Sequence, residues 1–296
     1  MKIIEPAVEL WQQGEDAIKH VARCARVCYR KTSGNDKDRY EFLIRDGHLS
    51  MLRHETYYAA VPAKGLDNII YKLLSGYQHC PYIKYITFDN ICYIVTNGNF
   101  MQDIMKTNPV LYTSILRYQI SEDEAKSIEY IFNHFIRYTF CVDTQISTSR
   151  ELNRVSPNNI AEQSTRYVYE DGSICRPHWL IGYQVLQHDN GNYVIYKDGR
   201  EDKDINHKVL TYINSCDSSF KNYEYLVKAG VAIQDARGVL PLDTATRCVY
   251  TYSIDEWRAI IDLRYYGTTG KPHPNAKIIA GMIREQLMGL SYDFRE

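Results

Sequence analysis

The segment Ser149–Tyr167, with the sequence SRELNRVSPNNIAEQSTRY, contains an unusual number of charged and hydroxyl side chains. It holds three guanidinium groups, two carboxylates and two adjacent hydroxyls: Arg150, Arg154, Arg166, Glu151, Glu162, Ser164 and Thr165. Arginine suits phosphate because its planar fork donates two parallel, charge-assisted hydrogen bonds. Taken alone, the cluster is better explained by surface ion pairs between the arginines and their acidic neighbours. Its meaning therefore depends on the rest of the chain.

The chain on both sides of this segment alternates between helical and strand patterns. Apolar spacing, caps and closing glycines predict helices over Glu15–Tyr29, Asp36–Asp46, Asn99–Lys106, Glu122–Phe135, Asn206–Ala229, Ile254–Tyr265 and Asn275–Leu290. β-type runs predict strands over Glu55–Val61, a hairpin over Tyr85–Asn97 that turns at Asp89-Asn90, and strands over Tyr138–Asp143, Tyr183–Gln187, Asn192–Tyr196 and Val249–Tyr252. Because no linker or low-complexity segment interrupts the pattern, one domain over residues 1–296 is expected.

The composition is ordinary for a soluble globular protein, with 45% hydrophobic and 24% charged residues in a chain of 296. The formal net charge is −1, so no global basic field indicates nucleic-acid binding. The eight cysteines are scattered without a CxxC pair, which favours reduced thiols over a metal site. The start of the chain has no apolar signal core, and no run is long enough to span a membrane. A cytoplasmic protein without membrane partners is expected.

The second half of the opening segment, Glu162–Tyr167, matches the Glu-x-Ser-x-Arg-Tyr end of a known nucleotide-binding signature. With this match the chain resembles the flavin-dependent thymidylate synthase family. Other blocks that resemble the family follow in the same order along the chain: Ala25–Tyr29, Gly47–His54, Ser149–Leu152, Ala229–Leu242, Glu256–Arg258, Leu263-Arg264 and His273–Asn275. Agreement in order over several blocks is hard to obtain by chance.

The resemblance implies an α+β fold, in which helices pack on a twisted, mostly antiparallel sheet. It covers residues 65–147 and 180–205 poorly, so these segments are interpreted as insertions in the single domain. It also implies a homotetramer with sites built where subunits meet. The sequence reveals no other way to bring Arg264 near Arg154, so an oligomer is expected from the resemblance.

The nucleotide half of the family's site is intact in this chain. The resemblance assigns the binding of dUMP to Arg154, Glu162, Ser164, Arg166, Arg237 and Arg264, with Glu151 and Thr165 beside them. Arg264 is expected to contact the uracil ring and to act as the catalytic residue, by stabilising negative charge that develops on the ring. Glu151 stands where the family usually has Gln, and a carboxylate beside a phosphate is unfavourable unless an arginine neutralises it.

The flavin half departs from the family. Positions that face FAD in the family carry other residues here: Val155, Ser156, Arg53, Ser253, Asp255 and Ala259. The residues that remain as candidates for FAD or folate binding are Cys28, His48, Ser50, Arg53, Ser253 and His273. Because FAD carries a pyrophosphate, the loss of cationic contacts is expected to weaken its binding.

The implied reaction is C5 methylation of dUMP to dTMP, with methylenetetrahydrofolate as one-carbon donor, FAD as reductant and NADPH to recharge the flavin. A first alternative is a relative that performs another one-carbon transfer, such as hydroxymethylation of dUMP or dCMP, without flavin reduction. The altered flavin positions favour this alternative. A second alternative, of another class, is a non-catalytic nucleotide-binding paralogue. The six retained nucleotide ligands argue against it.

The substitution Arg166→Ala is expected to abolish nucleotide binding, because it removes a charge-assisted donor from the phosphate. Equilibrium titration of the purified variant with dUMP measures this effect. An affinity equal to that of the unchanged protein would refute the assignment of the nucleotide site.

Overall fold

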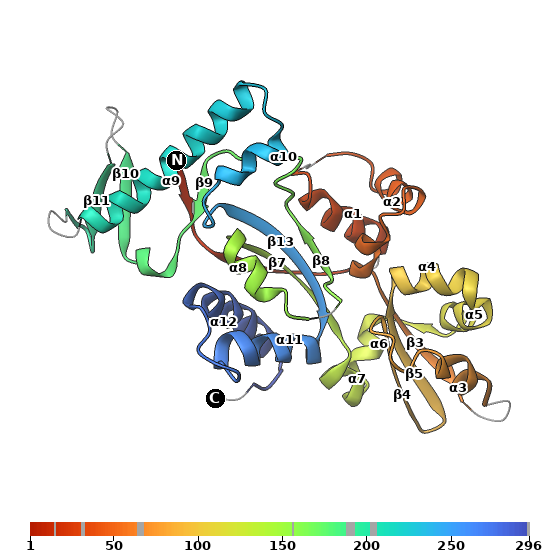
Figure 1. Cartoon of the computed structure of the whole chain (residues 1–296). Coiled ribbons are helices and arrows are strands. Elements are labelled where there is room, and N and C mark those ends of the chain that lie inside the picture. Colours follow the sequence, from red (N-terminus) through yellow and green to blue (C-terminus); the bar gives the residue numbers. More distant parts are fainter. Residues whose placement is uncertain are drawn as a thin grey trace.

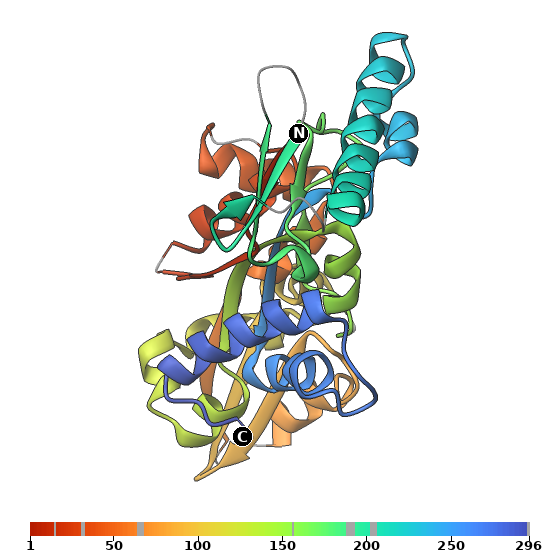
Figure 2. The same cartoon turned by 90° about the vertical axis from the view of Figure 1, so that its left-hand side faces the viewer.

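A computed structural model describes residues 1–14, 16–30, 33–63, 68–155, 157–187, 193–201 and 206–294. Figures 1 and 2 show helices packed around antiparallel strands, with the long strand β13 (Ala245–Ser253) crossing the middle of the molecule. The expected α+β class is confirmed. Within these residues, no helix combines the length and apolarity that crossing a membrane requires.

The central sheet has the strand order β2-β7-β13-β8, and each neighbouring pair is antiparallel. Besides β13, its strands are β2 (Ala7–Trp11), β7 (Arg137–Gln145) and β8 (Ile160–Glu162). The long pair β7–β13 runs from Ala245 opposite Gln145 to Ser253 opposite Arg137. This pair therefore forms the middle of the sheet, and nearly every residue of β7 is buried.

Side chains of β7 and β13 alternate between the two faces of this sheet, as strand geometry requires. Phe140 and Tyr250 lie in the main core together with Ile283 of the C-terminal helix. The next residues along the two strands, Cys141 and Val249, belong to a separate cluster with Cys24 and Trp11. One face thus packs against the C-terminal helices and the other against the first helix, as Figure 1 shows.

The helices that cover the two faces of the central sheet can be grouped by position. Those on the C-terminal side are α8 (Ile146–Leu152), α11 (Ile254–Ile261), the π-helical turn η4 (Asp262–Tyr266) and α12 (Pro274–Gly289). Those on the opposite side are α1 (Ala17–Val27), α2 (Asp36–Arg45) and the 3-10 helix η1 (Leu49–His54).

A second antiparallel sheet, of order β4-β5-β3-β6, builds its own core beside the first. Its strands are β3 (Thr56–Pro62), β4 (Ile83–Phe88), β5 (Ile91–Asn97) and β6 (Gln119–Ile120). The helices that pack into this core are α3 (Asn68–Ser75), α4 (Gly98–Thr107) and α5 (Pro109–Arg117). The next two helices, α6 (Glu122–Lys126) and α7 (Glu129–His134), bury Ala125 and Ile131 in the main core. The expected hairpin is confirmed, because Asp89 and Asn90 both take positive φ, 49° and 59°, as its two-residue turn requires.

The remaining elements lie at the end of the molecule that carries the N-terminus (Figure 2). They are β1 (Lys2–Ile4) with its parallel partner β9 (Ser173–Cys175), the sheet β10 (Tyr183–Gln187), β11 (Tyr193–Lys197) and β12 (Arg200–Glu201), and the helices η2 (His178–Leu180), α9 (Asn206–Lys228), α10 (Ile233–Ala236) and η3 (Arg237–Val239). Residues 188–192, which join the two predicted strands here, lie outside the described residues. The single domain and its two insertions stay predictions.

One expected helix is wrong in its extent. The segment predicted as a helix over Glu122–Phe135 is broken between α6 and α7, because Ile128 takes an extended backbone with φ −95° and ψ 106°. The Ser127 hydroxyl donates to the Glu124 carbonyl at 2.6 Å and helps to end α6. The capping box of Ser121 and Glu124 forms as predicted, so the start of this segment is correct.

Arg137, the first residue of β7, joins the two large sheets. Its buried guanidinium donates to the carbonyls of Arg53 at 2.7 Å and Glu55 at 3.0 Å, which lead into β3, and to the carbonyl of Thr251 on β13 at 3.3 Å. Its backbone N–H donates to the Tyr58 hydroxyl at 3.1 Å. No described carboxylate forms an ion pair with the Arg137 guanidinium, so its charge is stabilised mainly by hydrogen bonds to backbone carbonyl oxygens.

The substitution Arg137→Met is expected to lower the free energy of unfolding by about 3 kcal/mol or more, because several buried carbonyls lose their donor. Chemical denaturation measures this effect, with Arg117→Met, a change at an exposed arginine of α5, as the control. The control is expected to stay within about 0.5 kcal/mol of the unchanged protein. A loss below about 1 kcal/mol in the Arg137 variant would contradict its proposed role.

Candidate functional site

The carboxylate of Glu151, at the end of α8, contacts two of the residues that were predicted to bind the nucleotide. Arg264 on η4 contacts its Oε2 through Nη1 at 3.0 Å, and Arg264 Nε also donates to the Glu151 carbonyl at 2.6 Å. Arg154 approaches the same Oε2 through Nη2 at 3.8 Å. The expected cost of a carboxylate in this site is therefore offset by two guanidinium groups.

Glu162 on β8 is linked to the same helix. Its Oε1 accepts hydrogen bonds from the hydroxyls of Ser149 on α8 at 2.8 Å and Thr246 on β13 at 3.2 Å. Burial raises the pKa of the Glu162 carboxyl above its ordinary value of 4.5, and these hydrogen bonds oppose the shift. The carboxyl is thus held in one position and can accept from a ligand hydroxyl.

The loop after β8 carries the remaining predicted ligands. The backbone N–H of Ser164 donates to the Cys28 carbonyl at 3.0 Å, and the Ser164 hydroxyl accepts from the Arg166 N–H at 3.3 Å. Arg237 of η3 donates from Nη1 to the Thr165 hydroxyl at 2.9 Å. Cys28, a candidate from the flavin half, therefore lies beside the nucleotide ligands, and burial raises the pKa of its thiol.

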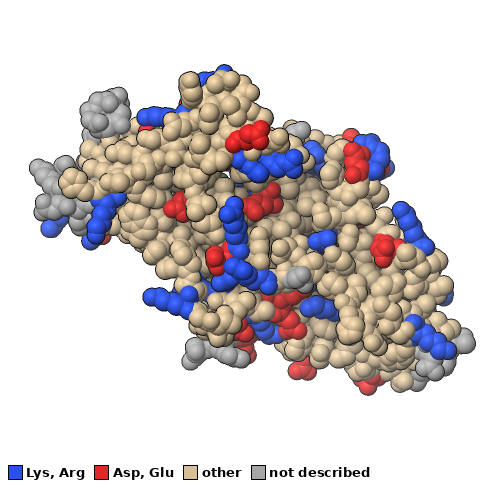
Figure 3. Space-filling model, viewed as in Figure 1, with Lys and Arg blue, Asp and Glu red and all other residues tan. Residues whose placement is uncertain are grey.

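We call this set the nucleotide cluster: Glu151, Arg154, Glu162, Ser164, Thr165, Arg166, Arg237 and Arg264. Basic and acidic side chains gather over the centre of the face drawn in Figure 3, where Figure 1 places α8 and β8. Arg154, Arg166 and Arg237 are exposed, so their charges are available to a ligand from solvent. A group of exposed guanidinium ions around a hydroxyl and a buried carboxyl suits a phosphorylated sugar.

A single chain brings Arg264 and Arg154 together on Glu151. The sequence offered an oligomer as the only way to do so, and that reason is wrong. α8, which follows β7, and η4, which follows α11, both pack against α12, and this packing places Glu151 beside Arg264. The homotetramer itself stays a prediction.

Three candidates from the flavin half lie on η1 or directly before it. His48 and Ser50 are exposed at its start. Arg53 donates from Nη1 to the Asn158 carbonyl at 3.1 Å, and its guanidinium lies 4.9 Å from the centre of the Tyr82 ring. Because Asn158 belongs to the loop between Arg154 and β8, η1 borders the opening segment of the sequence.

The other two candidates serve as helix caps. The hydroxyl of Ser253 is buried, accepts from Lys84 Nζ at 2.9 Å and donates to Glu256 Oε2 at 2.8 Å at the start of α11. His273 Nδ1 accepts from the backbone N–H of Asn275 at 3.2 Å at the start of α12. Both side chains therefore have local structural partners, and the structure does not bring them to the nucleotide cluster.

The residues at the family's flavin positions do not fit the pyrophosphate of FAD in this chain. Val155 packs against the main core. Asp255 pairs with His134 at 3.1 Å and with Arg258 at 3.3 Å, which places a carboxylate where a cation was expected. Among the described residues at these positions, only Arg53 carries a positive charge. Ser156 lies outside the described residues.

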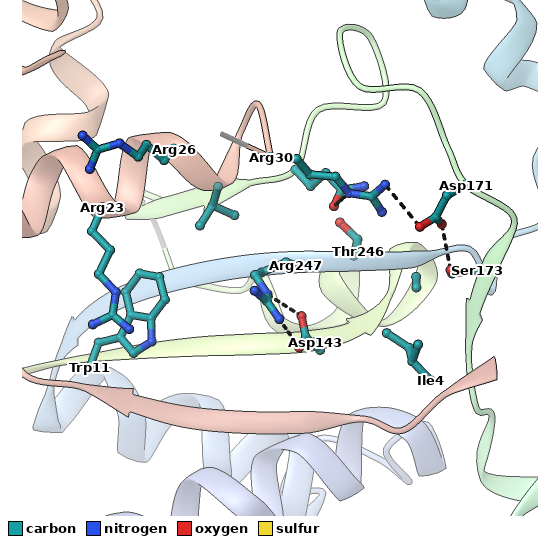
Figure 4. Close-up of a pocket in the computed structure, with 13 residues that line it drawn as sticks. Ile4, Trp11, Arg23, Arg26, Arg30, Asp143, Asp171, Ser173, Thr246 and Arg247 are labelled. Atoms are coloured by element: carbon teal, nitrogen blue, oxygen red, sulfur yellow. Dashed lines mark hydrogen bonds and ion pairs between the residues drawn. The ribbon is translucent and has the colours of Figure 1, made fainter. Parts of the chain in front are cut away.

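A cavity of about 560 Å³ lies between α1 and the central sheet, and the sequence did not predict it. Figure 4 shows Arg23 over Trp11 at one end, Arg30 near Asp171 at the other, and the Arg247–Asp143 pair between them. Arg26 also lines the cavity. The sequence carried a partial signal for it, because Arg23 and Arg26 are three apart on α1, and Arg30 follows shortly after the end of that helix.

The sequence of the chain matches the model of one known protein family. Residues 99–289 match the model of a family described as "Thymidylate synthase complementing protein", which is well over half of the chain. No curated protein sequence matches the chain. Within the described residues, no group of three or more His, Cys, Asp or Glu side chains could hold a metal ion.

Two solved structures are similar to the whole chain at a low level. One is the UMP/dUMP methylase PolB from Streptomyces cacaoi bound with 5-Br dUMP, with 15% identity, a TM-score of 0.46 and coverage of 98% of this chain and 93% of that one. The other is the same methylase bound with 5-Br UMP, with 16% identity, a TM-score of 0.44 and coverage of 98% and 92%. Likeness at this level supports no conclusion about substrate.

The raised pKa of Glu162 predicts a pH effect on stability. The folded chain holds the proton of the Glu162 carboxyl more tightly than the unfolded chain does. The contribution of this proton to the free energy of unfolding therefore falls as pH rises from about 4.5 through the raised pKa of the folded chain. Because Glu162→Gln does not titrate, the unfolding free energy of the variant minus that of the unchanged protein is expected to increase with pH through this window. Denaturation of both proteins between pH 4 and pH 8 measures it, and a constant or decreasing difference would contradict the assignment.

Proposed function

Because the chain belongs to the thymidylate synthase complementing protein family, we propose that it transfers a one-carbon unit to C5 of dUMP and forms dTMP. Methylenetetrahydrofolate is the proposed donor. In this reaction a bond forms between C5 and the donor carbon, the bond from that carbon to the folate nitrogen breaks and releases tetrahydrofolate, and the C5 proton leaves. A hydride, for which a reduced flavin recharged by NADPH is the proposed source, would reduce the transferred carbon to a methyl group. The chain's own residues bind and orient the nucleotide and stabilise charge on its ring.

The observation that carries the proposal is the assembly of the nucleotide cluster within one chain. Arg264 and Arg154 meet on Glu151, and α8 connects this carboxylate to Glu162 through Ser149. The loop after Glu162 then presents the remaining ligands. Residues from distant parts of the sequence thus converge as the binding of one nucleotide requires.

We assign the phosphate to the exposed end of the cluster. Arg166 and Arg237 supply guanidinium groups there, and Ser164 and Thr165 supply hydroxyls. Arg237 already donates to Thr165, so little rearrangement is needed to turn either group toward an anion. The buried carboxyl of Glu162 is assigned to a ribose hydroxyl, which it can accept from.

Arg264 is assigned to the pyrimidine ring. Its side chain is only 15% exposed, and its two contacts with Glu151 fix the guanidinium in place. C5 attacks the one-carbon donor more readily when the ring oxygens carry negative charge, and a fixed cation stabilises that charge without reorganising. Glu151 is a positioning residue in this scheme.

Hydroxymethylation is a second candidate, and the flavin positions favour it. Addition of water in place of hydride would complete the transfer without a reductant. Val155 and the paired Asp255 leave these positions without the cationic contacts that FAD needs. The alternatives therefore differ in the reductant and in the product, while the nucleotide cluster serves both.

Incubation of the purified protein with dUMP, methylenetetrahydrofolate, FAD and NADPH is expected to yield dTMP, identified by mass spectrometry. Omission of FAD or NADPH is expected to stop its formation. A hydroxymethyl product that persists without them would select the second candidate. Nucleotide binding without any product, also with dCMP, would identify a non-catalytic paralogue.

The substitution Arg264→Gln is expected to lower kcat by about 100-fold or more, because one charge-stabilising donor is lost. Arg117→Gln, at an exposed arginine of α5, serves as the control and is expected to keep the activity. An unchanged kcat in the Arg264 variant, with normal nucleotide affinity, would refute its role at the ring.

A further inference from the structure

The cavity under α1 has features of a built binding site that the nucleotide cluster does not use. Its volume of about 560 Å³ lies within the range of small-molecule sites in proteins. Apolar side chains such as Ile4 and Val27 line it together with several arginines. We propose that this cavity binds a second nucleotide, with its base at the Trp11 end and its phosphate at the Arg30 end.

The Trp11 end carries a buried donor that lacks an acceptor. Trp11 is only 7% exposed, lines the cavity, and its indole N–H has no hydrogen-bond partner among the described residues. A buried N–H without an acceptor costs free energy. A ligand carbonyl or ring nitrogen that accepts a hydrogen bond from the indole N–H would remove this cost and so favour binding. Pyrimidine and purine bases both provide such acceptors.

Arg23 adds a flat surface at the same end. Its guanidinium carbon lies 3.5 Å from the centre of the Trp11 ring, so the ring holds the guanidinium plane in place. The ion pair of Arg23 with Glu9, at 3.5 Å, is between two exposed side chains and constrains it little. The face of the guanidinium that does not contact Trp11 can stack on a planar base.

The Arg30 end suits an anion. Arg30 Nε donates to Gln163 Oε1 at 2.7 Å and Nη2 contacts Glu170 at 3.5 Å, so the guanidinium is fixed. Its Nη1 has only longer contacts, 3.5 Å to the Tyr169 carbonyl and 3.8 Å to Asp171. Nη1 is therefore the donor with capacity left for a phosphate oxygen.

The carboxylate of Asp171 lies where the ligand's anion would bind. It accepts from the Ser173 hydroxyl at 2.7 Å and faces Arg30 across the end of the cavity (Figure 4). Because Asp171 is 48% exposed, it can turn to solvent when a phosphate with more acceptor oxygens takes its place. Arg30 and Ser173 would then both donate to the phosphate.

The backbone of Arg30 is also unusual. It takes a positive φ of 49°, which is uncommon for a residue other than glycine, asparagine or aspartate. Such strain is retained where the surrounding structure fixes a side chain for a purpose. Here the strained backbone directs Arg30 across the cavity to Gln163 and Asp171.

The cavity borders the nucleotide cluster through shared residues. Thr246 lines the cavity and donates to Glu162, and Gln163 lies between Glu162 and Ser164 in the chain. A ligand held by Gln163 and Arg30 therefore acts on the loop that carries the phosphate ligands of the cluster. The second nucleotide is thus placed to change the affinity of the first, and the coupling must be reciprocal.

Tryptophan fluorescence tests the proposal without any turnover. The chain has three tryptophans. The variant Trp11→Phe keeps the other two and therefore measures the fluorescence change that does not come from Trp11. Titration with dUMP, dTMP and dTTP is expected to change the emission of the unchanged protein with saturation for at least one of them, and to leave the Trp11→Phe signal flat. The same change is expected to persist in Arg166→Ala, because that variant affects only the nucleotide cluster.

The variant Arg30→Asn removes the guanidinium without creating strain, because asparagine tolerates positive φ. Its melting temperature is expected to fall, because the buried Glu170 loses its contact with a guanidinium, so affinity is measured well below that temperature. Nucleotide affinity at the cavity is expected to fall at least about tenfold, the effect of one charge-assisted hydrogen bond. Arg45→Asn, at an exposed arginine of α2, is the matched control and is expected to leave the affinity unchanged.

Four results would overturn the proposal. They are the absence of a saturable change with all three nucleotides, loss of the change in Arg166→Ala, an equal affinity in Arg30→Asn, and an equal response to inorganic phosphate or 5-formyltetrahydrofolate alone. Loss of the change in Arg166→Ala would mean that one site explains all binding. Because no outcome depends on catalysis, a failure here is separate from a failure of the proposed reaction.

Discussion

The buried guanidinium of Arg137 is the contact on which the arrangement of this chain depends. It donates to the carbonyls of Arg53 and Glu55 at the entry to the second sheet and to the carbonyl of Thr251 in the central sheet, while its own N–H donates to Tyr58. Hydrogen bonds to carbonyls are directional, so these contacts fix one orientation of the two sheets. Because β7 begins at Arg137 and leads directly into α8, the same strand also positions the nucleotide cluster.

Strand alternation then gives the central sheet two different faces. The face of Phe140 packs on α11 and α12, and the face of Cys141 packs under α1. The nucleotide cluster lies where α8 and β8 meet, and the cavity lies beneath α1 on the Cys141 face. Glu162, Gln163 and Thr246 connect the two regions. Both contain arginines that carboxylates hold in place, which is consistent with a chain whose net charge is only −1.

The sequence by itself determined the features that a few neighbouring residues control. Capping boxes form at Ser121 and Ser253, the hairpin turns at Asp89 and Asn90, and the long helix ends before Gly230, which takes a φ of 91°. These were predictable because caps and turns depend on hydrogen bonds and φ preferences within about four residues. The order of short blocks was likewise sufficient to recognise the family, which the match over residues 99–289 confirms.

Only the tertiary structure decided which distant groups meet. The pairing of Glu151 with Arg264, the hydrogen bond that Lys84 donates to Ser253, and the cavity that extends from Arg30 to Trp11 all depend on how strands pair and helices pack. Such contacts leave little trace in local sequence, because each partner alone also fits a solvated surface. The segment Ser149–Tyr167 illustrates both contributions: its residues predicted a nucleotide site, and the packing of α8 and η4 on α12 brought Arg264 to Glu151 within one chain.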